Sequence, residues 1–160
     1  GIEKEDGTGN INYTPENHEK MVHLRAAKVA GIANDIPPAA VIGDADADVC
    51  VLGWGSTWAA IDAAVQRTRR RGSSVAWVHH THLNPLPANL GDLLRRFRQI
   101  VVPELNLGQL CRIVRAEYLV DARSISKVQG LPFTAREIET AIDDALERLR
   151  TEASGGTQAP

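Results

Sequence analysis

Residues 48–58, with the sequence DVCVLGWGSTW, constrain the fold more than any other stretch of the chain. The apolar run Val49–Leu52 is typical of a buried strand, and Gly53 and Gly55 after it predict a tight turn. A helical pattern begins at Ser56. Strand, turn and helix form the first half of a βαβ unit, whose turn lies at the sheet edge where ligands and partners bind. The question for the chain is whether this turn holds a ligand or only reverses the chain.

Helices and strands alternate along the rest of the chain. Helices are predicted over 15–33, 56–71, 90–97, 106–118 and 134–150, and strands over 39–42, 49–52, 74–80, 99–105 and 120–129. Such alternation with short connections predicts an α/β fold of three layers, in which a mostly parallel sheet carries helices on both faces. By residue ranges, we expect a linker plus N-terminal helix over 1–38, the α/β domain over 39–130, a C-terminal helix over 131–150 and a disordered tail over 151–160.

Capping residues and apolar spacing refine the terminal helices. Thr14 before Pro15 is a typical helix N-terminus, and the apolar face of the helix that follows consists of Val22, Ala26, Val29 and Ala33. Thr134 and Glu137 fit a capping box, which Phe133 and Ile138 flank as a hydrophobic staple.

The turn after the third strand of the βαβ pattern has its own capping signal. Asn106 fits an N-cap, and Gln109 stands three residues later, at the capping-box position. The predicted buried stripe of the helix consists of Leu107, Leu110, Cys111, Val114 and Tyr118. Capping geometry is therefore a complete alternative to any functional interpretation of Asn106 and Gln109.

Composition and termini narrow the class of protein. The net charge of −2 favours neither nucleic acid nor an anionic membrane as partner, and no apolar stretch approaches the ~20 residues of a membrane span. Without a visible signal peptide, we expect a cytoplasmic location. Cys50 and Cys111 lie in apolar segments, which predicts buried reduced thiols, and an iron–sulfur cluster needs about four cysteines. Because the chain begins at Gly1, we expect a processed or recombinant product or a piece of a longer polypeptide.

Two catalytic interpretations of the glycine turn fail on particular residues. A dinucleotide fingerprint needs a small residue where Trp58 stands, and an acid after the second strand, where the chain has His79 and His80. A hydrolase elbow needs a second glycine after Ser56, which is absent. Binding of some other phosphate at the start of this helix stays open, as does a metal pair of His80 and His82.

Four motifs in order carry a family resemblance. They are GNINYTPENHEKMVHLRAAKV at 9–29, VLGWGSTW at 51–58, HLNPLP at 82–87 and VPELNLGQL at 102–110. In this order and spacing, over roughly residues 1–145, the chain resembles the C-terminal part of the α subunit of 2-oxoacid:ferredoxin oxidoreductases, of the 2-oxoglutarate type with two kinds of subunit.

The resemblance implies a fold similar to the C-terminal domain of transketolase, with about five strands, one of them antiparallel. It implies an intact enzyme that converts 2-oxoglutarate and coenzyme A into succinyl-coenzyme A and carbon dioxide while reducing ferredoxin. Thiamine diphosphate, Mg²⁺ and an iron–sulfur cluster of the β subunit would lie outside this chain, which itself would hold no cofactor, metal or catalytic residue. Its partners would be the rest of the α subunit and the β subunit, with ferredoxin as electron acceptor, and neither nucleic acid nor a membrane.

The matching motifs suggest a set of domain or subunit contacts near the carboxyl edge of the sheet: Gly53, Gly55, Ser56, Asn84, Pro85, Glu104, Asn106, Gly108 and Gln109. For each of these residues, turn or cap geometry is the competing explanation. Two other functions stay open, namely a free-standing module that binds phosphate or a nucleotide, and an assembly domain without an enzymatic role.

Overall fold

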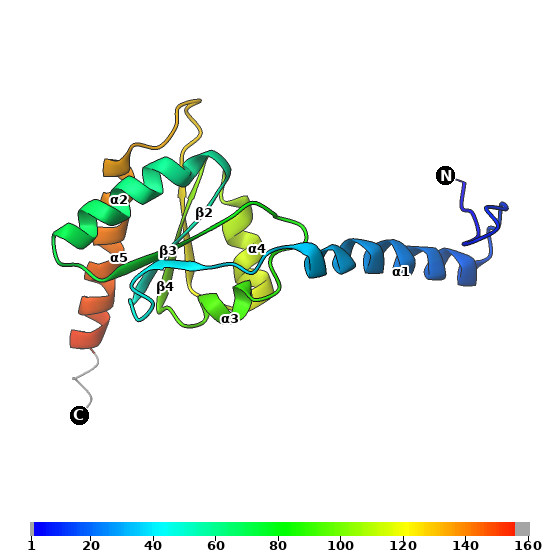
Figure 1. Cartoon of the computed structure of the whole chain (residues 1–160), viewed down its shortest axis with the longest axis horizontal. Coiled ribbons are helices and arrows are strands. Elements are labelled where there is room, and N and C mark those ends of the chain that lie inside the picture. Colours follow the sequence, from blue (N-terminus) through cyan, green and yellow to red (C-terminus); the bar gives the residue numbers. More distant parts are fainter. Residues whose placement is uncertain (1, 156–160) are drawn as a thin grey trace.

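The computed structural model describes residues 2–155 and contains a five-stranded sheet between two layers of helices (Figure 1). The strands are β1 (Val41–Gly43), β2 (Val49–Trp54), β3 (Val75–His80), β4 (Gln99–Glu104) and β5 (Ala122–Ser126). The helices are α1 (Pro15–Gly31), α2 (Trp58–Arg70), α3 (Leu90–Leu94), α4 (Gln109–Tyr118) and α5 (Ala135–Gly155), with short 3₁₀ helices η1 (Ile32–Asp35) and η2 (Gly55–Thr57). The predicted three-layer α/β fold is confirmed.

The sheet has the order β1-β3-β2-β4-β5, and only β1 runs antiparallel to its neighbour. After β2 the chain moves through α2 to β3 on one side, and then crosses back over β2 to reach β4 on the other. The direction of winding therefore reverses between β2 and β4. In open α/β sheets, the crevice at such a reversal is the usual place for ligands and partners.

Each face of the sheet has its own core. Helices α2 and α5 cover one face, where strand residues such as Val49, Val51 and Trp77 are buried beneath them. Helices α3 and α4 cover the other face, where Cys50, Leu52 and their neighbours are buried. This alternation along β2 follows from the period of two in a strand, and the absence of polar residues between Val49 and Leu52 follows from burial on both sides.

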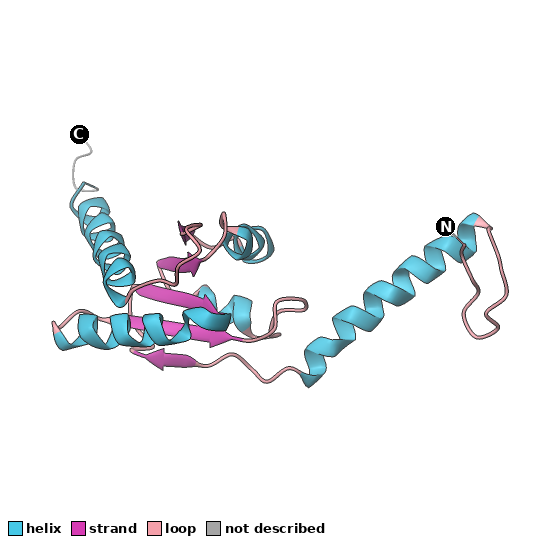
Figure 2. Ribbon diagram, turned by 90° about the horizontal axis from the view of Figure 1, so that it is seen from above, coloured by secondary structure: helices cyan, strands magenta, loops and turns pink. Residues whose placement is uncertain are grey.

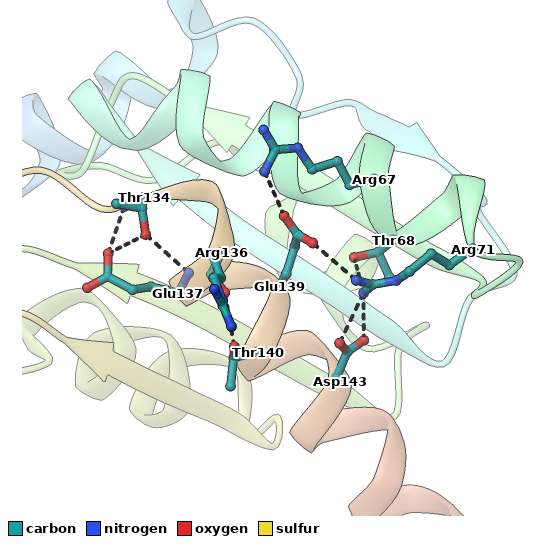
Figure 3. Close-up of polar contacts among 9 residues, drawn as sticks. All are labelled: Arg67, Thr68, Arg71, Thr134, Arg136, Glu137, Glu139, Thr140 and Asp143. Atoms are coloured by element: carbon teal, nitrogen blue, oxygen red, sulfur yellow. Dashed lines mark hydrogen bonds and ion pairs between the residues drawn. The ribbon is translucent and has the colours of Figure 1, made fainter.

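Helices α2 and α5 are joined at the surface by ion pairs (Figure 3). Arg67 and Arg71 donate to the two carboxylate oxygens of Glu139 at 3.2 and 3.1 Å, and Arg71 also reaches Asp143 at 3.0 Å. At the start of α5, the amide and hydroxyl of Thr134 donate to the carboxylate of Glu137, and the amide of Glu137 donates back to the Thr134 hydroxyl. This is the predicted capping box. These bonds and Lys127 lower the pKa of Glu137 to about 2, with the Lys127 contact as the largest cause. Through their ion pairs with Glu139 and Asp143, Arg67 and Arg71 thus link α2 to α5.

Several predicted boundaries were wrong. Strand β2 continues through Gly53 to Trp54, so Gly53 lies in the strand and the turn begins at Gly55, whose φ is 57°. Helix α2 consequently begins at Trp58 rather than Ser56. Helix α5 continues to Gly155, so the disordered tail is wrong over 151–155, while 156–160 lies outside the described residues.

Residues 2–35 form an arm that stands clear of the α/β domain (Figure 2). We call residues 2–35 the N-terminal arm; α1 is its main element. Because β1 is antiparallel to β3, Val41 pairs with Val78, near the carboxyl end of β3. The chain therefore enters the domain from the carboxyl edge, and the arm extends from that side. None of the helices within residues 2–155 is both long and apolar enough to cross a membrane.

Close packing around position 53 requires a glycine, and this requirement can be tested. A Cβ atom at Gly53 would lie 2.3 Å from Cδ1 of Ile61 and 3.0 Å from Nδ1 of His79. We predict that Gly53→Ala lowers the free energy of unfolding by about 1–3 kcal/mol, because the added methyl overpacks the contact between β2 and α2. Urea titration followed by circular dichroism measures this loss.

Ile61→Val removes the Cδ1 atom and should recover part of the loss in the double variant, whereas Gly31→Ala, with open space at its Cβ, serves as the control. Strictly additive losses from Gly53→Ala and Ile61→Val would contradict the proposed contact.

Candidate functional site

A crevice opens at the carboxyl edge, where the winding of the sheet reverses. Strand β2 pairs with β3 along its whole length, but with β4 only from Val49 to Val51. On its other side β4 pairs with β5 from Ile100 to Glu104, whereas beyond Val51 and Val101 the ends of β2 and β4 are no longer partners. The resulting crevice has a volume of about 110 Å³ and is lined by Trp54, Ser56, Thr57, Leu105 and Asn106. Two separate turns thus meet here.

The first wall of the crevice is the turn after β2. The hydroxyl of Thr57 donates to the carbonyl oxygen of Trp54 at 2.8 Å, and the amide of Trp54 donates back to that hydroxyl at 3.3 Å. Thr57 is buried, whereas Gly55 and Ser56 are exposed. The turn is therefore closed by its own side chain, and it presents Ser56 to the outside.

The second wall is the turn between β4 and α4, and its polar groups satisfy one another. Fully buried Glu104 accepts from the amides of Leu110 at 2.7 Å and Cys111 at 3.1 Å. The side-chain oxygen of Asn106 accepts from the amides of Gly108 and Gln109 at 2.8 and 2.9 Å. The amides that could attract an anion at the start of α4 are therefore already occupied.

This arrangement corrects the prediction for Asn106 and Gln109. Asn106 does cap backbone amides, but α4 begins only at Gln109, so Gln109 is the first helical residue and not the capping-box partner. Leu107 consequently lies in the turn and is 67% exposed rather than buried in the helix stripe. The missing information was Glu104, whose carboxylate accepts from the amides of Leu110 and Cys111, as an N-cap side chain usually does.

Histidines line the adjacent end of β3. Nδ1 of buried His80 lies 2.9 Å from the carbonyl oxygen of His82 and can donate to it, which makes Nε2 the acceptor nitrogen. Within the described chain, buried nitrogens without a hydrogen-bond partner include Nε2 of His80, Nδ1 of His79 and Nε1 of Trp54. Burial lowers the pKa of His80 and of His79, so both rings are neutral at neutral pH. Over residues 2–155, no three histidines, cysteines or acids are placed to hold a metal ion.

The two thiols are buried, as predicted, and are not nucleophiles. Burial raises the pKa of Cys50 far above its ordinary value. The pKa of Cys111 is raised by burial and then by the charge of Glu104, and its thiol donates to the carbonyl oxygen of Ala122. Both groups remain protonated at neutral pH, and a thiol in that state reacts poorly.

The carboxyl edge also exposes large apolar side chains. They follow β2, β4 and β5, and their exposed fractions range from 40% to 67%; we call them the carboxyl-edge patch: Trp58, Leu105, Leu107, Val128 and Leu131. An apolar surface beside a polar crevice is typical of a protein contact. Sequence analysis missed this patch, because it assigned Leu107 to the buried stripe of a helix. The signal was the position of these residues just after strand ends.

The predicted contact residues fall into three groups. Gly55, Ser56, Asn84 and Gln109 are exposed, Pro85 and Asn106 are partly exposed, and Gly53, Glu104 and Gly108 are buried. Ser56 and Asn106 meet in the crevice. Asn84 and Pro85 lie apart, in a hollow of about 250 Å³ between the loop after β3 and helix α4. The buried residues act inside the domain and offer no surface to a neighbour.

The crevice has little capacity for catalysis. Its lining residues include no acid, histidine or cysteine, and therefore no general base beside Ser56. What the edge offers is a shaped apolar surface with a few polar groups, which suits binding to another protein chain.

Comparison with known proteins identifies what this chain is similar to. No family model matches it. It is 48% identical over 147 residues to the 2-oxoglutarate oxidoreductase subunit KorA of Mycobacterium tuberculosis, and the match covers 91% of this chain and 22% of that protein. It is 31% identical over 156 residues to the α subunit of 2-oxoacid:ferredoxin oxidoreductase 1 of Aeropyrum pernix, which covers 92% of this chain and 24% of that protein. The chain thus spans about a quarter of the length of these relatives.

Solved structures show the same family similarity. A 2-oxoglutarate:ferredoxin oxidoreductase of Magnetococcus marinus, determined with 2-oxoglutarate, coenzyme A and succinyl-CoA bound, superposes with a TM-score of 0.81 at 31% identity. The match covers 88% of this chain and 25% of that one. A split-gene transketolase matches with a TM-score of 0.57 at 22% identity over 68% of this chain and 41% of that one, which shows a shared fold alone.

The buried Glu104 provides a test of the second wall. We predict that Glu104→Ala lowers the free energy of unfolding by about 2–4 kcal/mol, because two buried amides lose their acceptor. Glu104→Gln should cost less, since one oxygen can still accept. Denaturant titration measures both, with exposed Glu117→Ala at the other end of α4 as the control. A loss from Glu104→Ala no larger than that control would refute the capping role.

The buried His80 predicts a pH dependence of stability. Unfolding returns its pKa from the lowered value to the ordinary 6.5, so the unfolded state binds more protons in the pH range between the two values. Stability is therefore fully present above pH 6.5 and falls as the pH drops toward the pKa of folded His80. We expect the melting temperature to fall as the pH is lowered through 6.5.

The fall should be shallower in His80→Gln, and should not vanish, because the pKa of His79 is also lowered. His23→Gln is the matched control, because the His23 side chain is 75% exposed. Equal pH dependence in His80→Gln and in the unchanged protein would argue against this origin.

Proposed function

The chain belongs to the α-subunit family of the 2-oxoacid:ferredoxin oxidoreductases, as its C-terminal segment, and we propose that it serves an enzyme acting on 2-oxoglutarate. The intact enzyme would convert 2-oxoglutarate and coenzyme A into succinyl-coenzyme A and carbon dioxide, and would pass the electrons to ferredoxin. The 48% identity to a 2-oxoglutarate oxidoreductase subunit, over 91% of the chain, carries this proposal. The buried free thiols agree with a reducing compartment, and we propose the cytoplasm.

The cofactors of such an enzyme would bind outside this segment. Thiamine diphosphate supplies the carbanion-stabilising chemistry of decarboxylation, and an iron–sulfur cluster of the β subunit carries the electrons. The crevice does not fit thiamine diphosphate and Mg²⁺, because its lining has no carboxylate and its Asn106 oxygen already accepts from two amides. In this proposal, residues of this chain therefore take no direct part in a reaction step.

The segment would instead hold the assembly together through its carboxyl edge. The exposed residues Gly55, Ser56 and Gln109 surround the crevice at the turns, and the apolar side chains of the carboxyl-edge patch lie next to them. Burying that patch against the rest of the α subunit or against the β subunit would contribute about 25 cal/mol for each Å² of apolar surface removed from water.

Co-expression of the complete α and β subunits tests this role. The assay follows reduction of ferredoxin that depends on 2-oxoglutarate and coenzyme A. We expect the complete enzyme to turn over, and this 160-residue chain alone to be inactive. Leu107→Lys with Leu131→Lys in the complete α subunit should cut activity or subunit co-purification at least about tenfold, because charges would be buried in the contact.

The matched control is Leu119→Lys, which places the same charge on a side chain that is 89% exposed at the far end of α4. Turnover by the isolated chain, or unchanged assembly of the Leu107→Lys/Leu131→Lys variant, would overturn the contact role. A complete enzyme that ignores 2-oxoglutarate would overturn the substrate assignment.

A further inference from the structure

The N-terminal arm exposes apolar side chains that nothing in the described structure covers. Among the residues of α1 only Asn17 is buried. The exposed fractions are 43% for Val22, 39% for Leu24, 40% for Val29 and 45% for Ile32, which follows α1 in η1. Figures 1 and 2 show α1 projecting away from the sheet and its covering helices. We call Val22, Val29 and Ile32 the bare face of the arm, and Leu24 is exposed on the other side of α1.

The arm is nevertheless a built unit rather than a loose linker. Its loop is fastened to the first turns of α1, since the side-chain amide of Asn17 donates to the carbonyl oxygens of Lys4 and Asn12. The carboxylate of Glu3 reaches His18 at 2.8 Å and Arg25 at 3.1 Å. The loop covers the start of the helix and leaves the bare face in the middle and at the end.

The root of the arm is fixed to the domain. The side-chain amide of Asn89, just before α3, donates to the carbonyl oxygen of Ala39 and accepts from its amide, both at 2.8 Å. Ile36 is buried at the junction. The direction of the arm, away from the carboxyl edge, is therefore set by contacts at its root.

A helix in this position needs a partner. Isolated helices shorter than about 12–15 residues are marginal in water even when rich in alanine, and most helices in proteins owe their stability to packing of an apolar face. Helix α1, with 17 residues, is only slightly longer than that limit. In α1 the apolar residues lie on more than one side, because Leu24 stands about 160° around the helix from both Val22 and Ala26. Such a distribution is typical of a helix enclosed by surrounding structure.

The length of the relatives indicates which partner. The similar α subunits are about four times as long as this chain. The match to the solved oxidoreductase covers 88% of this chain, which residues 36–160 cannot reach alone, so the match extends into the arm. The arm is thus shared with a chain in which three quarters of the α subunit are also present.

We propose that the bare face of the arm packs against the preceding part of the α subunit, so that this segment is joined to the rest of its own polypeptide through α1 as well as through the backbone. The inference rests on the proposed function and adds a defined surface to it. Because the arm leaves from the carboxyl edge, one neighbouring body can contact both the arm and the carboxyl-edge patch.

Hydrogen exchange of the α1 amides tests the proposal in three samples: this chain alone at low and high concentration, the complete α subunit without the β subunit, and the assembled enzyme. We expect amides 21–31 to exchange quickly in the isolated chain at both concentrations, and roughly 100-fold more slowly in the α subunit alone. Equal exchange in the isolated chain and the α subunit would overturn the proposal. Protection that needs the β subunit, or that rises with the concentration of this chain, would assign the face to another partner and overturn it too.

Variants of the bare face sharpen the test. Val22→Glu with Val29→Glu in the complete α subunit should remove the protection of α1 and leave residues 41–149 protected, whereas Val22→Ile and the distant Leu119→Asn should preserve both. Protection of α1 that survives the double glutamate variant overturns the proposal. If α1 is protected but ferredoxin reduction does not depend on 2-oxoglutarate, only the proposed function fails. If ferredoxin reduction depends on 2-oxoglutarate but α1 is not protected, only the inference fails.

Discussion

Burial of strand β2 on both faces is the constraint on which the rest of the structure depends. Its side chains from Val49 to Leu52 are fully buried, alternately under α2 and α5 and under α3 and α4. A strand buried in this way cannot present functional groups along its length, so only the edges of the sheet are available. Because β2 and β4 stop pairing after Val51 and Val101, the carboxyl edge is also the place where the sheet opens.

The polar groups at that edge divide into satisfied and unsatisfied ones, and the division bears on function. Glu104, Asn106 and Thr57 bond to nearby backbone, which fixes the turns and occupies the side-chain oxygens of these three residues. The ring nitrogens of Trp54, His79 and His80 include buried atoms without partners in the described structure. A site prepared for catalysis normally combines a nucleophile with a base and an orienting group, and this edge has no such set. This chemistry supports the proposed docking role of the edge.

Local sequence signals predicted the elements well where the cause is local. The buried strand at Val49–Leu52, the capping box of Thr134 and Glu137, and a short strand before β2 are all present. Prediction failed where the local structure depends on a residue far along the chain or on a partner outside the segment. The start of α4 depends on Glu104, a strand residue that reaches forward to amides six and seven positions away. Gly53 looked like a turn glycine, although its real cause is the close approach of Ile61.

The N-terminal helix shows the same limit in another form. Periodicity located apolar residues such as Val22 and Val29, but no pattern within one segment can state what covers them, because that depends on chain outside the segment. The antiparallel direction of β1 supplies the missing geometry, since it brings the root of the arm to the same edge as the carboxyl-edge patch. Two apolar surfaces on one side of a domain can contact one neighbour together. Once the first contact forms, the second becomes intramolecular, so each can be weak while the joint remains firm. In the proposed function, such a joint lets this segment determine whether the α subunit assembles with its partners.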